Sequence, residues 1–282
     1  MGRLTSRKKV LRIDGDRVVH RPDTLAVEEP LEIRVGGRPL SVTMRTPGDD
    51  MDLAAGFLVS EGVISRTDEL RGMRFCDGAV VDGLNTYNVL DLELDPSVPA
   101  LDPSVERSFY TTSSCGVCGK ASLDAVRTTT SYDVTGDPVS VTPALLSALP
   151  DRLREAQRVF DKTGGLHAAG LFDATGDLLC LREDVGRHNA VDKVVGWALR
   201  EGRLPLTGCV LMVSGRASFE LVQKAWMAGI PILAAVSAPS SLAVELAEEA
   251  GLTLVGFLRG TTMNVYARAD RVALPHADTS TR

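Results

Sequence analysis

Apolar and polar residues alternate over short stretches in the N-terminal third of the chain, which is the pattern of strands with one buried face. Gly36-Gly37 lies between two such stretches and favours a two-residue hairpin turn. A continuous apolar run over 53–59, preceded by Asp49-Asp50, predicts a short helix. Strands are predicted at 31–35, 40–45, 72–76 and 86–94. This part of the chain is therefore expected to be β-rich.

From residue 141 the pattern changes to apolar strands that alternate with helices of about ten residues. Thr142-Pro143 supplies a helix cap followed by proline in the first turn, and predicts helical structure to about residue 160. Strands at 167–172 and 178–181 flank Ala174-Thr-Gly-Asp177, which predicts a hairpin. Further strands are predicted at 210–213, 232–236 and 252–257, and helices at 189–199, 219–227 and 241–250. This order predicts an α/β domain with a largely parallel sheet. We expect a β-rich N-terminal domain over 28–140 and an α/β cofactor-binding domain over 141–270.

The composition favours an ordinary globular protein and excludes several function classes. Of 282 residues, 44% are hydrophobic and 24% are charged, with a net charge of −6 and 5% aromatic residues. Such a chain has neither the basic field nor the stacking platforms of a general nucleic-acid-binding protein. No apolar run approaches the roughly 18 to 20 residues of a membrane helix, and no secretory signal is recognisable. Five scattered cysteines argue against a disulfide framework, so a cytoplasmic location is expected, with no membrane or nucleic-acid partner.

Cys115-x-x-Cys118 is the one pair of cysteines at short spacing, and the glycines around it predict a loop. Lys120 is a nearby cation that favours the reactive thiolate. Three interpretations compete: a structural zinc site, dithiol redox chemistry, and a mobile nucleophilic thiol. Zinc is the weaker one because no second ligand pair follows at zinc spacing, so no metal site is predicted. Redox chemistry fits the spacing but lacks its usual strand-to-helix context, and the mobile nucleophile fits best.

The other three cysteines are not expected to carry chemistry. Cys180 and Cys209 lie within apolar strand patterns and are predicted to be core residues. Cys76 is placed at the end of a strand.

Three loops rich in hydroxyl groups follow the predicted parallel strands, at 214–218, 237–241 and 257–262. Loops at the carboxyl ends of parallel strands meet along one rim of the sheet, where ligands bind. Two of these loops open helices, whose free N–H groups favour anions. Arg216 and Arg259 add positive charge. The rim is therefore predicted to bind a phosphate-bearing ligand, with Ser214, Arg216 and Ser237 among its residues, although neither a P-loop nor a dinucleotide fingerprint is present.

Two histidine-containing segments are the remaining candidates. His167 lies in an apolar strand pattern, which is more typical of a core residue than of a ligand. Arg187-His188-Asn189 is richer in hydrogen-bond donors than a helix start requires, and is interpreted as pocket lining. Asp192 and Lys193 are expected on the solvated face of the following helix.

Six motifs in a fixed order resemble one known family. They are Thr46-Pro-Gly-Asp-Asp50, Gly56-Phe-Leu-Val-Ser-Glu-Gly62, Cys115-Gly-Val-Cys-Gly119, Gly165-Leu-His-Ala-Ala169, Arg182-Glu-Asp-Val-Gly-Arg-His-Asn189 and Gly256-Phe-Leu-Arg-Gly260. Together they resemble the formate dehydrogenase accessory sulfurtransferase (FdhD) family over roughly residues 28–268. The number of spaced motifs makes this resemblance specific.

The resemblance implies a sulfur carrier. Members of this family take sulfur from a cysteine desulfurase as a cysteine persulfide and pass it to the molybdenum bis(molybdopterin guanine dinucleotide) cofactor, which formate dehydrogenase needs. The family motif places the persulfide on Cys115, with Cys118 as its partner in relaying or resolving the sulfur. The family's cofactor-binding stretch corresponds to Phe257, Leu258, Arg259, Gly260, Thr261 and Thr262, and a guanine nucleotide would fit the same pocket. The resemblance does not decide whether the protein is a homodimer or which client enzyme it serves.

The same resemblance implies that the C-terminal domain is an α/β sandwich similar to the cytidine deaminase fold, beside a smaller β-rich N-terminal domain. A zinc deaminase needs H-x-E followed downstream by P-C-x-x-C. Here Ala168-Ala169 follow His167, and the Cys-x-x-Cys pair lies upstream, so deaminase chemistry is the less favoured alternative. A chaperone that binds the pterin cofactor without catalysis is the other alternative, and it should tolerate the loss of Cys115.

Overall fold

The structure, a computed structural model, describes residues 3–77, 80–81, 84–86, 88–99, 130 and 132–274. The predicted Cys-x-x-Cys loop, with Cys115 and Cys118, lies outside the described residues. The structural statements that follow concern the described parts of the chain.

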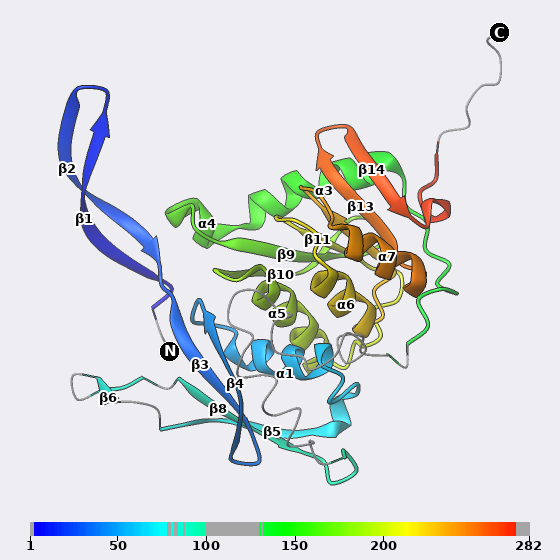
Figure 1. The fold of residues 1–282 in the computed structure, drawn as a ribbon, viewed down its shortest axis with the longest axis horizontal. Helices are drawn as coiled ribbons and strands as arrows, with labels where there is room; N and C mark the ends of the chain where they lie inside the picture. The colour runs from blue at the N-terminus through cyan, green and yellow to red at the C-terminus, as the bar shows by residue number, and fades with distance from the viewer. Residues whose placement is uncertain are drawn as a thin grey trace.

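A six-stranded mixed sheet forms the centre of the C-terminal half, in the order β10-β9-β11-β12-β13-β14 (Figure 1). Its strands are β9 (His167–Phe172), β10 (Leu178–Asp184), β11 (Val210–Val213), β12 (Ile232–Ala235), β13 (Thr253–Arg259) and β14 (Thr262–Ala267). β11, β12 and β13 are parallel to one another, whereas β9, β10 and β14 extend the sheet through antiparallel pairs. The parallel central strands and the hairpin of β9 and β10 are confirmed, whereas the antiparallel edge strand β14 was not predicted, so the sheet is mixed.

Helices cover both faces of this sheet, and successive strand residues enter different cores. Val210 and Met212 of β11 pack in the same core as α3 (Pro143–Ala156), whereas Leu211 and Val213 pack with α5, α6 and α7. These last three helices span Arg187–Arg200, Phe219–Met227 and Ser241–Ala250. The short helix α4 (Arg158–Thr163) follows α3 directly. The result is a three-layered α/β arrangement (Figure 1).

Local sequence accounts for where α3 and α4 begin and end. Thr142 caps α3, since its side-chain oxygen accepts a hydrogen bond of 3.1 Å from the Leu145 N–H. Pro143 occupies the first turn, where no backbone donor is needed. α4 ends at Gly164, whose φ of 66° lies in the left-handed region.

A second, four-stranded sheet lies in the N-terminal third, in the order β4-β3-β8-β5. Its strands are β3 (Glu29–Val35), β4 (Arg38–Arg45), β5 (Leu70–Cys76) and β8 (Val89–Leu94). Gly36 and Gly37 form the predicted two-residue turn with φ values of 56° and 78°. The helix α1 (Asp50–Ser60) includes the predicted helical run and packs against α5, and the short strands β6 (Val80–Val81) and β7 (Leu84–Asn85) form a separate pair. One-turn helices, η1 (Thr67–Glu69) and η3 (Ala269–Arg271), complete the described elements.

One hydrophobic core connects the two parts of the chain. It contains Leu31 and Leu90 of the N-terminal sheet together with Val191 of α5 and Leu211 of β11. The division at residue 140 stays a prediction.

A separate ribbon precedes both sheets. β1 (Thr5–Asp14) and β2 (Arg17–Ala26) pair with each other and extend away from the body (Figure 1). The hydrophobic pattern of the sequence did not predict this ribbon. Among the described helices, none is long and apolar enough to cross a membrane.

Candidate functional site at the strand ends

The pairing of the C-terminal sheet brings many strand ends to one edge. The carboxyl ends of β10, β11, β12 and β13 lie beside the amino ends of β9 and β14. This edge therefore collects His167, Asp184, Ser214, Ser237 and Thr262 from segments far apart in the sequence. Ligands bind at such edges because the loops there are not paired within the sheet and lead into the N-termini of helices.

The three predicted loops are joined to one another by backbone contacts. Ala217 forms a parallel bridge with Pro239, and Ser240 N donates a hydrogen bond of 3.0 Å to Ala217 O. Phe257 N donates a hydrogen bond of 3.2 Å to Ser237 O, which ties the second loop to the third. The structure thus brings together the loops that the sequence placed on one rim.

The predicted serine and arginine side chains of the rim differ in burial and in their hydrogen bonds. Ser214 is structural, since its Oγ accepts a hydrogen bond of 2.9 Å from Ala168 N, and it also lines a pocket. Arg259 is exposed, and its Nε donates a hydrogen bond of 3.1 Å to Val236 O. Arg216 is exposed and Ser237 is half-buried. Both arginines therefore present exposed positive charge at the rim.

The stretch from Phe257 to Thr262 adopts an unusual backbone. Phe257 has a φ of 52°, which is rare for a bulky residue, and its side chain is 41% exposed. Gly256 permits a close approach, because a Cβ there would lie 2.9 Å from Pro239 Cδ. Strain of this kind is typical of functional positions. The exposed aromatic ring can stack on a planar ligand.

The remaining residues of that stretch complete its hairpin. Leu258 is fully buried, whereas Gly260, Thr261 and Thr262 are exposed. Thr262 Oγ1 donates a hydrogen bond of 3.0 Å to Arg259 O across the turn.

The two predicted helix N-termini differ in what they offer an anion. Ser240 caps α7, since its Oγ accepts from Ala243 N at 3.2 Å, so one donor there is already satisfied. Ser218 does not cap α6 with its side chain, and its Oγ lies 3.2 Å from His188 Nε2. The α6 N-terminus therefore keeps more free backbone donors than the α7 N-terminus.

A third helix N-terminus, that of α5, brings Arg187 to the same edge. A Cβ on Gly215 would lie 3.5 Å from His167 Nδ1 and 3.9 Å from Arg187 Cδ, so both side chains border this glycine. Among the described residues, Arg187 Nε is buried and has no hydrogen-bond partner. A buried donor without a partner is costly, and an anionic ligand would satisfy it.

The two histidines at this edge are in different environments. Burial, with the nearby positive charges of Arg187 and His188, lowers the pKa of His167. His167 is therefore half-buried beside the pocket rather than a fully enclosed core residue. His188 Nε2 lies 2.6 Å from Glu220 Oε2. Burial alone would raise the pKa of Glu220, but the hydrogen bond and charge of His188 offset this and lower it.

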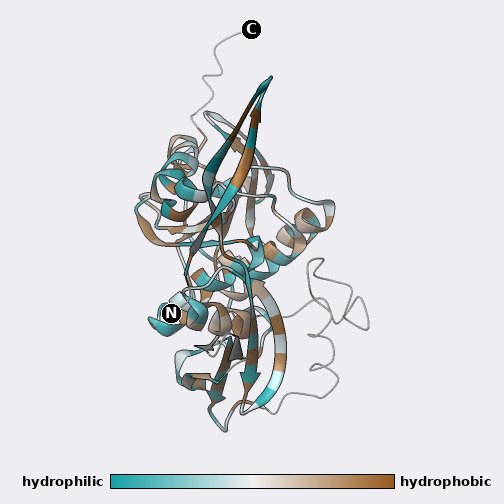
Figure 2. Ribbon diagram, turned by 90° about the vertical axis from the view of Figure 1, so that its left-hand side faces the viewer, coloured by the Kyte–Doolittle hydropathy of each residue, from teal (hydrophilic) through white to brown (hydrophobic). Residues whose placement is uncertain are grey.

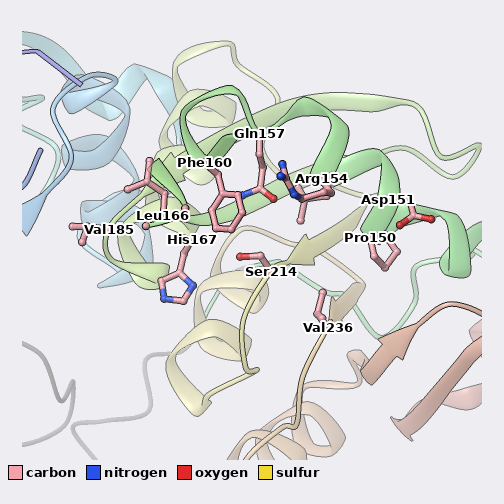
Figure 3. Close-up of a pocket in the computed structure, with 13 residues that line it drawn as sticks. Pro150, Asp151, Arg154, Gln157, Phe160, Leu166, His167, Val185, Ser214 and Val236 are labelled. Carbon is pink, nitrogen blue, oxygen red and sulfur yellow. The ribbon is translucent and has the colours of Figure 1, made fainter. Parts of the chain in front are cut away.

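A pocket of about 670 Å³ opens beside the rim, between α3, α4 and the ends of β9, β11 and β12 (Figure 3). Gln157 lines this pocket and is 3% exposed. Phe160, His167 and Val236 supply aromatic and apolar walls. A volume of this size fits a nucleotide-sized ligand, and the buried amide can read a heterocycle with both donors and acceptors.

Gln157 and Phe160 were not predicted from the sequence as site residues. Both lie where α3 passes into α4, within a segment whose pattern predicts only helix. Their place at the pocket depends on how α4 lies against the sheet edge, which periodicity does not encode. A buried glutamine between two short helices is the one feature that could have marked the position.

The expectation that two charged residues of α5 face solvent is contradicted by their burial. Asp192 and Lys193 are buried, so the prediction of a solvated face was wrong. Each is neutralised by an ion pair of 2.8 Å, Asp192 with Lys224 and Lys193 with Asp184, and sequence alone does not reveal such partners.

The expectation for the core cysteines is confirmed. Cys180 and Cys209 are buried, and burial raises the pKa of their thiols to about 12 and about 11. Cys76 is half-buried at the end of β5. None of these three thiols is at the strand-end edge.

Curated relatives match almost the whole chain. The sulfur carrier protein FdhD of Streptomyces avermitilis is 66% identical over 275 residues, covering 97% of this chain and 98% of that protein. The protein of the same name from Anaeromyxobacter sp. (strain K) is 48% identical over 262 residues, covering 89% of each chain. The crystal structure of a putative formate dehydrogenase accessory protein from Desulfotalea psychrophila superposes with a TM-score of 0.76 at 25% identity, covering 96% of this chain and all of that one.

The family comparison agrees with the resemblance that the sequence motifs indicate. The sequence model of the FdhD/NarQ family matches residues 26–273, which include every strand of the two main sheets and the Cys-x-x-Cys pair. This match spans far more than half of the chain. The chain belongs to the FdhD/NarQ family.

Proposed function

We propose that this chain is a cytoplasmic sulfur carrier for formate dehydrogenase, which receives sulfur from a cysteine desulfurase and delivers it to the molybdenum bis(molybdopterin guanine dinucleotide) cofactor. The family and the printed names of its relatives support the sulfur-carrier role. The observation that carries the substrate assignment is the strand-end edge. There the buried Arg187 Nε lacks a hydrogen-bond partner among the described residues, and the buried Gln157 lines a nucleotide-sized pocket.

The edge has a suitable group for each part of such a substrate. The phosphates would bind Arg187, Arg259 and the free N–H groups of α6, because cations and helix N-termini stabilise anions. A heterocycle would stack on Phe257 or enter the pocket beside Gln157. The bound cofactor would supply the molybdenum that accepts sulfide. The protein residues bind the phosphates, orient the rings and exclude water.

Sulfur loading on Cys115 is a thiolate displacement. The Cys115 thiolate attacks the outer sulfur of the desulfurase persulfide, the sulfur–sulfur bond breaks, and the electron pair leaves with the desulfurase cysteine. The product is a Cys115 persulfide and a free desulfurase thiolate. Lys120, five residues after Cys115, favours the attacking thiolate.

Cys118 would complete delivery without an outside reductant. Its thiolate attacks the inner sulfur of the Cys115 persulfide, which forms a Cys115–Cys118 disulfide and releases the outer sulfur as hydrosulfide. The two electrons that convert this sulfur to sulfide come from the two cysteine thiols. Two cellular thiols then reduce the Cys115–Cys118 disulfide by thiol–disulfide exchange, leave as their own disulfide and restore the carrier.

Intact-mass spectrometry tests this function directly. After incubation with a cysteine desulfurase and cysteine, the protein should gain the mass of one sulfur atom, and Cys115→Ala should gain none. Cys180→Ala and Cys209→Ala are matched controls and should load normally, since burial keeps both thiols protonated. Equal loading of Cys115→Ala and the parent would exclude the persulfide assignment. If Cys115→Ala also restored full formate dehydrogenase activity in cells, the chaperone alternative would hold instead.

A further inference from the structure

The short helix α4 depends on other parts of the molecule for its stability. It has six residues, and its N-cap residue Gln157 makes no side-chain capping hydrogen bond. Helices shorter than about 12 residues are not stable alone in water, because the first turn costs more backbone entropy than its hydrogen bonds return. The contacts that hold α4 in place therefore also determine where the side chains of α4 and of its N-cap lie.

Glu183 of β10 binds the start of this helix. Its Oε2 accepts a hydrogen bond of 2.9 Å from Val159 N, and its Oε1 accepts one of 2.8 Å from Phe160 N. Both carboxylate oxygens thus bind N–H groups of the first turn, which have no partner within the helix and where the helix dipole favours a negative charge. One side chain of the central sheet therefore fixes the start of α4.

Glu183 and its neighbour Asp184 act on opposite faces of the central sheet, because side chains alternate along a strand. Asp184 is fully buried and pairs with Lys193 of α5 at 2.8 Å. Leu181 packs in the core that contains α3, and Glu183 lies on this same face. Asp184 consequently stabilises the α5 layer, whereas Glu183 stabilises the layer of α3 and α4.

Another neighbour of α4, the N-terminal ribbon, gives it weaker support. α4 packs against β2. None of the ten residues of β2 is buried, and hydrophilic residues are interspersed with hydrophobic ones along the ribbon (Figure 2). A two-stranded sheet is only marginally stable without a covering surface. The hydrogen bonds of Glu183 therefore attach α4 to the more rigid partner, which is the central sheet.

The side chains placed by this contact line the strand-end pocket. Gln157 lies immediately before α4, and Phe160 is one of the two residues whose N–H groups bind Glu183. Both side chains line the pocket of about 670 Å³ (Figure 3). The Arg154 guanidinium lies 4.8 Å from the centre of the Phe160 ring and orients this ring once α4 is in place. We call Gln157 and Phe160 together the α4 wall.

We propose that Glu183 is a positioning residue, which holds the α4 wall where the heterocycle of the nucleotide substrate binds. This inference rests on the proposed function, which assigns a nucleotide-bearing substrate to the strand-end site. The Phe160 ring offers a stacking surface, and the Gln157 amide offers a donor and an acceptor to ring atoms. A displaced α4 would misplace both groups. It would leave the phosphate end unchanged, because Arg259 lies on β13, a different element.

Calorimetric titration with guanosine diphosphate tests this role. Glu183→Ala should weaken binding roughly ten- to a hundredfold, because two charge-assisted hydrogen bonds no longer hold the α4 wall. Glu183→Gln keeps the length of the side chain and one acceptor oxygen, so its affinity should lie between those of Glu183→Ala and the parent. Amide hydrogen exchange should show reduced protection of Val159 N and Phe160 N in the same order. Urea denaturation checks that each variant is folded.

Double-mutant cycles on the affinity distinguish positioning from a general structural effect. Because Glu183 acts through the α4 wall, Glu183→Ala should cost little further affinity when Phe160→Ala is already present. Combined with Arg259→Ala at the phosphate end, the two losses should add. If Glu183→Ala does not fold, Glu183→Gln replaces it in both cycles.

Glu69 provides the matched control. Its carboxylate accepts hydrogen bonds of 2.6 Å from Ser65 N and 3.0 Å from Arg66 N beside η1, so it also holds two backbone N–H groups, but it does not line the strand-end pocket. Glu69→Ala should lose stability to a similar extent and bind guanosine diphosphate as the parent does.

The outcomes separate this inference from the proposed function. Unchanged affinity in a folded Glu183 variant, beside a parent that binds guanosine diphosphate, would overturn the inference and leave the proposed function intact. Additive losses in the cycle with Phe160→Ala, or an equal loss of affinity in Glu69→Ala, would have the same meaning. A parent that does not bind guanosine diphosphate would overturn the nucleotide assignment of the proposed function and this inference with it.

Discussion

Gly56 of α1 and Gly196 of α5 face each other where the two helices cross. A Cβ on Gly56 would overlap Asp192 O, and a Cβ on Gly196 would overlap Asp52 O. Both clashes are with backbone atoms, which cannot rotate away. The crossing therefore depends on the absence of side chains at these two positions, and it holds the N-terminal sheet against the helix that begins at the strand-end site.

Substitution of Gly196 by alanine should destabilise the protein strongly. The extra methyl group forces α1 and α5 apart, and overpacking of this kind typically costs about 1–3 kcal/mol or more. Urea denaturation should show the corresponding loss in the free energy of unfolding. Gly72→Ala is the control, since a Cβ there meets nothing within 4 Å. Equal stability of the Gly196 variant and the parent would contradict the close packing described above.

Asp192 of α5 contacts side chains of α1 and α6, and its substitution should also destabilise the protein strongly. It pairs with Lys224 of α6 at 2.8 Å and accepts a hydrogen bond of 2.6 Å from Ser60 Oγ of α1. Burial alone would lower the pKa of Lys224, but the Asp192 carboxylate offsets this and raises it. Asp192→Asn leaves that ammonium buried without its ion-pair partner, so we expect a loss of about 3–5 kcal/mol.

A double-mutant cycle checks that explanation. Lys224→Met removes the buried charge and fills similar space, so in combination it should recover much of the loss caused by Asp192→Asn. Denaturation of the two single variants and the double variant gives the coupling free energy. Additive losses would mean that the carboxylate acts through Ser60 or packing and not through the ion pair.

The C-terminal strands were predicted to within a few residues because each is a nearly continuous apolar run. β11 (Val210–Val213) matches its prediction, since all four residues are buried between two helical layers. β1 and β14 (Thr262–Ala267) were missed for the opposite reason. Their residues are mostly exposed, so no buried face imposes a hydrophobic pattern. Strands stabilised by pairing alone leave a weak signal in sequence.

Site residues were predicted where polar or charged side chains directly follow an apolar strand in the sequence. Ser214 and Arg259 are of this kind, because the end of an apolar run marks the edge of the sheet. Gln157 was missed because α3 and α4 reach the edge through tertiary packing. Asp192 and Lys193 of α5 were predicted to be solvated because their ion-pair partners, Lys224 and Asp184, are not evident from the sequence alone.

His167 should make stability depend on pH in the weakly acidic range. Burial lowers the pKa of this imidazole below its ordinary value of 6.5, so the unfolded chain binds the proton more readily. The contribution of His167 to stability is complete above about pH 6.5 and is lost as the pH falls through the lowered pKa. His167→Gln should therefore lose less stability than the parent between about pH 7 and about pH 5.

Urea denaturation at several pH values measures this difference. His20→Gln is the control, since His20 is exposed on the ribbon, and it should follow the parent curve. Identical slopes for the His167 variant and the parent would mean that the buried imidazole is not the titrating group.

Arg259→Ala should weaken binding of guanosine diphosphate, the probe for the nucleotide end of the proposed substrate. The exposed guanidinium is anchored through its Nε to Val236 O, which leaves its terminal nitrogens for phosphate. Loss of one charge-assisted hydrogen bond costs roughly 1.5–3 kcal/mol, or about ten- to a hundredfold in affinity. Calorimetric titration should show this, with persulfide loading on Cys115 unchanged. Arg66→Ala is the control, because Arg66 is also exposed but pairs with Asp68 beside η1 and so should not contribute to binding. Unchanged affinity in a folded Arg259 variant would exclude the guanidinium as a phosphate ligand, since a surface ion pair alone changes affinity by less than about fivefold.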